Sequence, residues 1–260
     1  MRYLPKELTN EIRQKYNFLQ HQEKYSLESQ CRKIASRRIA KNAQVHSYEI
    51  ENPHLSIPFS IPRNNKKKMI KNGIKNMETA FAWGVNNFDP LNFDESFIRE
   101  LAGKIYPEIH HNIIAQYRSN NVRILGASKL SPDSYKVISR EIPWFVDSLR
   151  RQLSCGDIVN KVQAAIFSHL HIARIHPFED GNGRTARTLQ NVILTSYKIP
   201  SPLISAGERH FYYTCLDEAV KGWSDNETEE ITTLSDGERL FYEFIAGKIN
   251  NSFDIVINNY

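Results

Sequence analysis

The segment from His176 to Arg187 constrains this chain more than any other, and it reads His-Pro-Phe-Glu-Asp-Gly-Asn-Gly-Arg-Thr-Ala-Arg. A periodic apolar pattern precedes it and two arginines follow its Gly-Asn-Gly turn, so the sequence predicts a helix, a sharp turn and a second helix. The N–H groups at a helix start bind anions, and arginines at positions i and i+3 share one helix face. The segment therefore predicts an anion site at the start of a helix, just after a histidine.

A carboxylate, Asp180, lies inside this predicted anion site. It would repel phosphates unless a cation lies between them, and Mg²⁺ commonly takes that place. His176 is positioned to accept a proton from an incoming hydroxyl group. The residues alone thus indicate a nucleotide-phosphate site with a base.

The same residues resemble the signature of the Fic family, His-x-Phe-x-(Asp/Glu)-Gly-Asn-Gly-Arg-x-x-Arg, at every fixed position. The resemblance implies an all-α Fic core and transfer of AMP from ATP, with Mg²⁺ as cofactor, to a hydroxyl side chain of a target protein or of the enzyme itself. It implies that His176 is the catalytic base and that Asp180 is the magnesium ligand. The implied nucleotide-binding residues are Asp180, Gly181, Asn182, Gly183, Arg184, Thr185, Ala186 and Arg187.

A second, shorter pattern, (Ser/Thr)-x-x-x-Glu-(Gly/Asn), covers Ser47 to Asn52 and is the inhibitory-helix signature of many Fic proteins. The resemblance implies that Ser47, Glu51 and Asn52 are regulatory and that Glu51 pairs with Arg187. An arginine–carboxylate pair can be bidentate, and it would occupy the guanidinium group that binds the γ-phosphate. We therefore expect an autoinhibited enzyme, and a solvated glutamate at a helix end is the alternative.

The stretch from Val122 to Val137 contains two short β-prone runs around a Ser-Pro-Asp-Ser turn, which predicts a β-hairpin. The resemblance implies that this hairpin is a small flap preceding the catalytic helix, and that its free edge pairs with an extended segment of the target protein. It also implies that Leu125 and Gly126 lie beside the nucleotide. A hairpin with a purely structural role is the alternative.

A helix is expected after Glu208, and it opens with an aromatic run that includes Tyr212 and Tyr213. Such a run usually packs in the core. The resemblance implies instead that these two tyrosines approach the adenine. Val220 stands where some relatives carry an asparagine, so one base contact of the family is missing.

Three histidines, His169, His171 and His176, have a spacing that could suggest a metal site. On one helix, however, His169 lies on the apolar face and His171 lies roughly 200° around the axis. The two side chains cannot easily converge, so we expect no zinc site. We interpret His169 as a hydrogen-bonded core residue.

The chain is long enough for one full core, with or without a small helical appendage. We expect an N-terminal helical region in residues 1–62, which holds the regulatory motif at 47–52 and a proline-containing linker. Residues 63–260 are expected to form the Fic core and a C-terminal helix.

A net charge of +5 is mild for 260 residues, and asparagine and glycine interrupt the densest basic run, Arg63 to Lys75. We therefore expect neither nucleic acid nor membrane as a partner, while a homo-oligomer is left open. The three cysteines cannot all pair, no stretch approaches the ~20 apolar residues of a membrane helix, and no signal peptide is evident. These features favour a cytoplasmic protein.

Three functions stay open from the sequence. The leading one is an autoinhibited protein adenylyltransferase. The second is hydrolytic removal of AMP from a modified protein, in which Glu51 would position a water molecule. The third is a nucleotide-sensing binding module with little turnover, against which His176 and Asp180 argue. Transfer of the γ-phosphate is disfavoured by Gly183.

Overall fold

The computed structural model describes residues 4–21, 27–51, 63–109, 114–124, 127–154, 156–223 and 234–258. Within these ranges the regular structure is helical, without a strand, so the all-α prediction is confirmed. The helices are α1 (Lys6–Gln20), α2 (Leu27–Glu51), α3 (Arg63–Asn87), α4 (Glu95–Ile105), α5 (Ser134–Lys136), α6 (Ile142–Ser154), α7 (Ile158–Ile175), α8 (Asn182–Ser196), α9 (Arg209–Gly222) and α10 (Asp236–Asn258), with a π-helical turn at Val137–Glu141 and a 3-10 turn at Ala206–Glu208.

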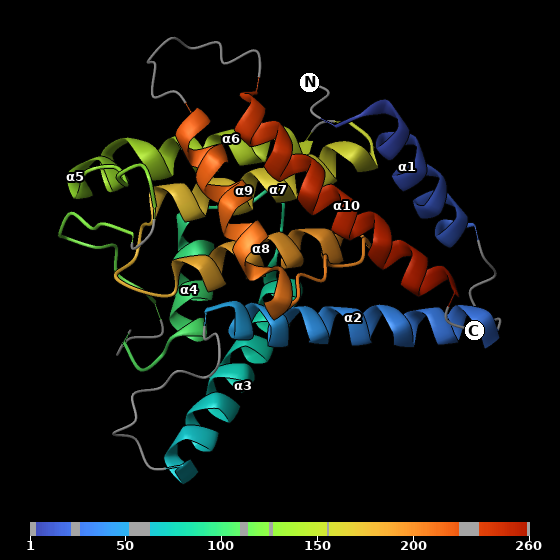
Figure 1. Ribbon diagram of the computed structural model, residues 1–260, viewed down its shortest axis with the longest axis horizontal. Helices are drawn as coiled ribbons and strands as arrows, with labels where there is room; N and C mark the ends of the chain where they lie inside the picture. The colour runs from blue at the N-terminus through green and yellow to red at the C-terminus, as the bar shows by residue number, and fades with distance from the viewer. Residues whose placement is uncertain are drawn as a thin grey trace.

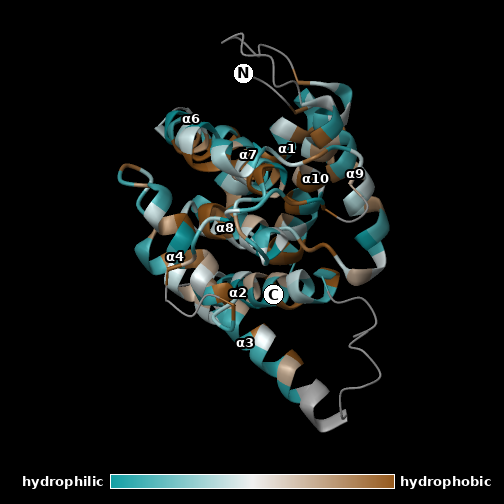
Figure 2. Ribbon diagram, turned by 90° about the vertical axis from the view of Figure 1, so that its left-hand side faces the viewer, coloured by the Kyte–Doolittle hydropathy of each residue, from teal (hydrophilic) through white to brown (hydrophobic). Residues whose placement is uncertain are grey.

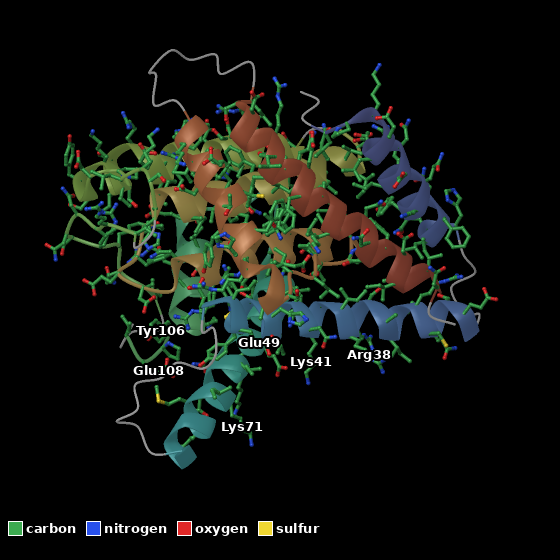
Figure 3. The ribbon with its side chains drawn as sticks, viewed as in Figure 1. Arg38, Lys41, Glu49, Lys71, Tyr106 and Glu108 are labelled. Atoms are coloured by element: carbon green, nitrogen blue, oxygen red, sulfur yellow. The ribbon has the colours of Figure 1, made fainter. Side chains whose placement is uncertain are left out.

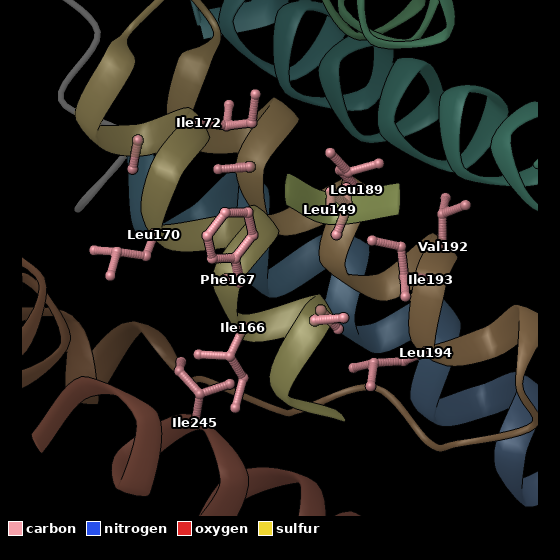
Figure 4. Packing of buried hydrophobic residues seen from close by; sticks show 14 of the residues in the cluster. Leu149, Ile166, Phe167, Leu170, Ile172, Leu189, Val192, Ile193, Leu194 and Ile245 are labelled. Carbon is pink, nitrogen blue, oxygen red and sulfur yellow. The ribbon is translucent and has the colours of Figure 1, made fainter. Parts of the chain in front are cut away.

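Helix α7 lies at the centre of the molecule, packed along α8, and α9 and α10 lie together over them (Figure 1). Asp157 starts α7, because its side chain accepts hydrogen bonds from the N–H groups of Val159 and Asn160. Nearly the whole of α7 is buried, as expected for a helix that is apolar around its circumference. Figure 4 shows Ile166 of α7 beside Ile245 of α10 in this core. The core therefore encloses the helix that leads into the motif.

Helix α2 lies across one side of this core, against α8, α3 and α10. Its buried residues recur at helical spacing, whereas Arg38 and Lys41 project from the outer face (Figure 3). A Cβ atom on Gly73 of α3 would lie 2.1 Å from the Tyr48 ring, so this glycine allows the two helices to approach closely. The packing directs the last turn of α2 toward the start of α8.

Figure 2 shows apolar residues gathered where α7, α8 and α10 meet, with polar residues on the outer surfaces of the helices. None of the described helices combines the length and hydropathy needed to cross a membrane. Apolar spacing in the sequence predicts one or two helices in residues 6–52 and further helices at 70–88, 94–106, 142–153 and 158–176, and all of these correspond to helices, most of them displaced by a few residues at their ends. A continuation of the helix at 94–106 through Ile113, which the same spacing allows, is wrong, because α4 ends at Ile105. The linker expected before Arg63 lies outside the described residues.

The hairpin predicted for residues 122–137 is not supported by the described part of that stretch. Tyr135 and Lys136, expected in the second strand, belong to the short helix α5, and Val137 begins the π-helical turn. Side chains take the place of a strand ladder here: Asn121 Oδ1 accepts from the Ser134 N–H group, and Arg118 donates to the Pro132 carbonyl. Local caps of this kind compete with sheet pairing, which the β-prone sequence does not reveal.

Candidate nucleotide-phosphate site

His176 is the residue at which α7 ends, and it adopts a left-handed backbone conformation with φ 52° and ψ 58°. Few residues other than glycine adopt this conformation without cost. The N–H group of His176 still donates to the Ile172 carbonyl at 3.0 Å, which closes the last turn of the helix. The chain therefore turns sharply at the imidazole, and the surrounding structure must hold that turn.

Arg118 supplies that support from a loop on the other side of the turn. Its side chain is only 2% exposed, and Nε donates to the His176 carbonyl at 2.7 Å. Other guanidinium N–H groups donate to the carbonyls of Asn120, at 2.8 Å, and Ile175, at 3.4 Å, while the Arg118 backbone N–H donates to the Pro177 carbonyl at 2.9 Å. One buried arginine thus fixes the backbone on both sides of the histidine.

The pKa of His176 lies below its ordinary value of 6.5, chiefly because the imidazole is buried. The charge of Arg118 lowers it further, whereas a hydrogen bond with the Ala173 carbonyl and the charges of Glu51 and Asp180 act in the opposite direction. The ring is therefore neutral near pH 7. A neutral, partly accessible imidazole is the form that can accept a proton.

The turn after His176 is held by the side chain of Asn182, the first residue of α8. Its Oδ1 atom accepts from the Phe178 N–H group and its Nδ2 atom donates to the Phe178 carbonyl, each at 2.8 Å. Phe178 is fully buried and stacks on Tyr117 at 5.6 Å. Gly181, with φ 79°, occupies the left-handed position that precedes the helix. The turn presents the free N–H groups of the first residues of α8 as an anion site.

Asp180 lies at the outer rim of this turn, with its side chain 55% exposed. Oδ1 accepts from the Gly181 N–H group at 2.5 Å, which leaves the second carboxylate oxygen for another ligand. Mg²⁺ is usually held by one or two carboxylates, with phosphate oxygens and water completing its coordination. A single accessible carboxylate beside an anion site fits that pattern.

Arg184 is held with its guanidinium group over the Tyr106 ring, 4.4 Å from the centroid. Its Nε atom is buried and has no hydrogen-bond partner within the described residues, and Nη2 lies 3.7 Å from Asp180 Oδ1. A buried cationic N–H group without an acceptor is costly. A phosphate oxygen bound at the start of α8 would supply the acceptor.

Arg187, one turn further along α8, is fully engaged with α2. Nη2 donates to Glu51 Oε1 at 2.6 Å and to the Ser47 carbonyl at 3.1 Å, and Nε donates to Ser47 Oγ at 2.8 Å. A Cβ atom on residue 183 would lie 2.2 Å from Glu51 Oε1, so only glycine leaves room for the carboxylate. The contact expected between Glu51 and Arg187 is therefore present in the structure.

Burial opposes ionisation of Glu51, but the charge and hydrogen bond of Arg187, assisted by Arg184 and His176, lower its pKa below the ordinary value. Burial likewise opposes ionisation of Arg187, but Tyr212 and Glu51 raise its pKa. The pair is therefore ionic. The Arg187 side chain is 4% exposed and the Glu51 side chain is 31% exposed, so solvent reaches the glutamate side of the pair.

The end of α2 has a further anchor on α9, which the sequence did not indicate. Arg209 Nε donates to the Ile50 carbonyl at 2.7 Å, and its guanidinium group lies 4.9 Å from the centroid of the Tyr213 ring. This bond satisfies one of the carbonyls that a helix end leaves without an intrahelical partner. Helix α9 therefore helps to hold the glutamate in place.

Tyr212 does not take the place expected of it. Its side chain is fully buried, so no face of its ring is available to an adenine, and its hydroxyl group contacts Arg187 and His169 instead. Tyr213 is partly exposed, and its contact with the adenine base stays a prediction. His169 is hydrogen-bonded on both ring nitrogens, which confirms it as a hydrogen-bonded core residue.

Two other residues of the predicted nucleotide site face the core. The side chains of Thr185 and Ala186 are fully buried, and the Thr185 N–H group already donates to the Gly181 carbonyl at 2.8 Å. They lie on the inner side of α8, opposite the arginines, so direct nucleotide contact by these side chains is not supported. Leu125, Gly126 and Asn52 lie outside the described residues.

Comparison with known proteins gives a consistent set of similarities. Residues 92–194 match the Fic/DOC family. A protein adenylyltransferase Fic of Nematostella vectensis is 34% identical over 114 residues, which cover 38% of this chain and 27% of that protein. The chain thus spans about a quarter of the length of the curated relatives it matches.

Solved structures share the fold over almost the whole chain. A Fic-domain-containing signaling protein of Bacteroides thetaiotaomicron superposes with a TM-score of 0.74 at 19% identity, over 97% of this chain and 96% of that one. A variant of IbpAFic2 in complex with adenylylated Cdc42 superposes with a TM-score of 0.53 at 15% identity, over 94% of this chain and 70% of that one. At these identities the likeness concerns the fold.

Proposed function

We propose that the chain is an autoinhibited protein adenylyltransferase, on the premise that residues 92–194, which match the Fic/DOC family, form a Fic domain. It transfers AMP from ATP to a hydroxyl side chain of a target protein or of itself. The observation that carries the proposal is the 2.6 Å contact between Arg187 Nη2 and Glu51 Oε1. That contact occupies an arginine of the candidate phosphate site.

The proposed reaction combines the placement of these residues with the resemblance to the Fic family, which supplies the phosphate that is attacked. Neutral His176 accepts the proton of the target hydroxyl, whose oxygen forms a bond to the α-phosphorus of ATP. The bond from that phosphorus to its bridging oxygen breaks, and pyrophosphate leaves in line. The N–H groups at the start of α8, with Arg184 and Arg187, bind the phosphates and stabilise the developing charge. Mg²⁺, held by Asp180, would neutralise the phosphate oxygens during transfer.

The comparisons support a protein as the target of this reaction. The curated relatives are named as protein adenylyltransferases, and one structural neighbour is bound to an adenylylated protein. We place the target beside the loop that Arg118 ties to the His176 carbonyl, because a hydroxyl there would meet the imidazole. The target itself is not named by any of these contacts.

A second function is favoured by one observation. The charge of Glu51 acts on the imidazole of His176 and raises its pKa, and the Glu51 carboxylate contacts Arg187 of the same site. A carboxylate in that place could orient a water molecule for hydrolysis of an AMP–protein bond. Glu51 would then take part in AMP removal as well as in inhibition.

The experiment that separates these functions uses ATP labelled at the α- or the γ-phosphate, with the wild-type protein and Glu51→Gly. AMP transfer predicts protein labelling from the α position alone, and stronger labelling of Glu51→Gly than of the wild type. Labelling from the γ position alone would contradict the proposal. Loss of AMP from a pre-modified protein by the wild type, but not by Glu51→Gly, would favour the removal reaction.

Two variants test the assigned roles in the Glu51→Gly protein. His176→Ala should reduce labelling by about 10²–10⁴-fold while ATP still binds, because the imidazole handles the proton and not the phosphates. Asp180→Ala should weaken labelling in a way that excess Mg²⁺ restores only slightly, because a metal ligand is lost. Undiminished activity of either variant would remove that residue from its role.

The coupling between Glu51 and Arg187 has its own test. Arg187→Ala should lose labelling, and adding Glu51→Gly to it should not restore activity, because the glutamate acts through that guanidinium. The double variant should therefore resemble Arg187→Ala, which is the non-additivity expected of directly coupled residues. Additive effects of the two substitutions would separate Glu51 from Arg187.

A further inference from the structure

A line of buried polar side chains extends behind Arg187, away from α2 and into the core. Arg187 Nη1 donates to the Tyr212 hydroxyl oxygen at 3.1 Å, that hydroxyl lies 2.8 Å from His169 Nε2, and His169 Nδ1 lies 2.8 Å from Gln190 Oε1. The four side chains are between 0% and 3% exposed. They come from three helices, α7, α8 and α9, so the line joins the central elements of the fold.

The direction of each hydrogen bond in this line follows from its first member. A guanidinium group has only donors, so the Tyr212 oxygen must accept from Arg187. The tyrosine proton is then free to point at His169 Nε2, which must be the unprotonated nitrogen. His169 Nδ1 consequently carries the proton and donates to Gln190 Oε1. Each hydrogen bond in the line therefore has one direction, and the Tyr212 hydroxyl and the His169 ring each accept one bond and donate one.

The imidazole suits this arrangement because it is neutral. Burial, and next the nearby charge of Arg187, lower the pKa of His169 to about 3, while the Gln190 hydrogen bond opposes the shift. The ring is also fixed by packing, since Phe241 meets it edge to face with centroids 5.2 Å apart. A neutral, immobile acceptor therefore sets the orientation of the Tyr212 hydroxyl.

The partners of Arg187 fall into two groups. Ser47 and Glu51 belong to α2, the element whose glutamate must withdraw before a phosphate can bind. The Tyr212 hydroxyl belongs to α9, and its hydrogen bond with Arg187 involves no group of α2. We propose that Tyr212, oriented by His169 and Gln190, is a positioning residue that holds the Arg187 guanidinium group in place to receive the terminal phosphates of ATP. This inference rests on the proposed function of the same site.

The test is a comparison of ATP with AMP in the Glu51→Gly protein, with Tyr212→Phe added. Dissociation constants for both nucleotides, in the presence of Mg²⁺, are measured by calorimetry. We expect ATP to bind about tenfold more weakly, which corresponds to roughly 1.4 kcal/mol, and AMP to bind as before, because AMP lacks the phosphates that Arg187 receives. Tyr242→Phe is the matched control, because Tyr242 is another buried tyrosine, 1% exposed, in α10.

Substitutions at His169 test the orientation of the hydroxyl. His169→Leu removes the acceptor and should weaken ATP binding as Tyr212→Phe does. His169→Gln can return an amide oxygen to the tyrosine proton and should recover part of the ATP affinity. Circular dichroism melts of each variant show whether the fold is retained, and the Tyr212→Phe result, which removes only a hydroxyl group from the core, stands if a histidine variant does not fold.

The outcomes separate this inference from the proposed function. Unchanged ATP affinity in Tyr212→Phe, or an equal loss for ATP and AMP, would overturn the positioning role even if Glu51→Gly labels proteins with AMP. A selective loss for ATP would support it even if no labelling occurs, and in that case the proposed transfer reaction alone would fail.

Discussion

Two buried arginines near the centre of this fold each pair with a glutamate, and the two glutamates differ in exposure. Arg174, near the end of α7, donates to Glu141 Oε2 at 2.7 Å, and the two side chains are 4% and 5% exposed. Arg187, in α8, donates to Glu51 Oε1 at 2.6 Å, and here the arginine is 4% exposed but the glutamate is 31% exposed. The two arginine side chains are equally buried, and of the two glutamate side chains only that of Glu51 reaches solvent.

The surroundings of the two pairs explain the difference. The Arg174 guanidinium group packs against the rings of Trp144 and Trp223, at 5.6 and 4.9 Å from their centroids, and Nε donates to His171 Nδ1 at 3.1 Å. Nothing can replace Glu141 there without opening the core. Glu51, by contrast, is the last residue of α2, so a shift of one helix turn would remove it. The first pair therefore belongs to the framework, and under the proposed function the second is the one that an anion replaces.

The largest effect expected from this comparison is the loss of stability in Glu141→Ala. Removing the carboxylate leaves the Arg174 charge buried and uncompensated, which typically costs about 3–5 kcal/mol. Urea unfolding of the variant and the wild type measures the difference. Glu51→Gly, measured in the same way, should lose only about 1–2 kcal/mol, because solvent can reach the site that the glutamate leaves. Equal losses in the two variants would contradict the distinction between the pairs.

The second expected effect is that ATP binding restores stability lost on removal of Glu51 but not stability lost on removal of Glu141. In Glu51→Gly the vacated guanidinium group can bind phosphate, and a ligand at about 100 times its dissociation constant stabilises the folded state by about 2.7 kcal/mol. Mg·ATP should therefore raise the melting temperature of Glu51→Gly more than that of the wild type or of Glu141→Ala. Glu49→Ala is the control, because Glu49 lies in the same turn of α2 but pairs with His46.

The two pairs also show which parts of a site a sequence can predict. The Glu51–Arg187 contact joins residues 136 positions apart, and it was predicted because both lie in motifs of a known family. The turn that carries His176, Asp180 and the α8 arginines is local, so its geometry follows from glycine positions and helix periodicity. The helices themselves were predicted in the same way, from apolar spacing.

What the sequence did not predict depends on contacts between distant segments. Arg118 is a single arginine in an irregular loop, and nothing in its neighbours indicates that it binds the His176 carbonyl. The burial of Tyr212 depends on α7 and α10, so the aromatic run alone could not distinguish a core tyrosine from a base contact. The predicted second strand failed for the same reason: its β-prone residues form a helical turn held by side chains from elsewhere in the loop.

A third buried arginine, Arg118, sharpens the comparison because it donates to backbone carbonyls where the other two donate to carboxylates. Lysine has a single nitrogen and cannot reach all of these oxygens at once. In the Glu51→Gly protein, Arg118→Lys should lower the rate of AMP labelling at saturating ATP by roughly tenfold, since a slightly misplaced base loses much of its effect. The KM for ATP should change little. A variant that loses ATP binding as strongly as rate would show a general structural role instead.

The smallest expected effect concerns the negative charge of Glu51 and its influence on the pKa of His176. Burial and Arg118 lower the pKa of His176 below 6.5, while Glu51 and Asp180 act against them. Removing Glu51 takes away a negative charge that favours the imidazolium form, so the pKa of His176 should fall further in Glu51→Gly.

An NMR titration of the imidazole signals, assigned with His176→Ala, measures this pKa in the wild type and in Glu51→Gly without nucleotide. Glu141 is not among the groups with the largest effect on this pKa, so any folded variant at that position should titrate nearly like the wild type. A pKa that rises in Glu51→Gly would mean that the glutamate does not lie beside the imidazole in solution. The hydrolytic role considered for Glu51 would then lose its support, while the pairing with Arg187 would still rest on its own contacts.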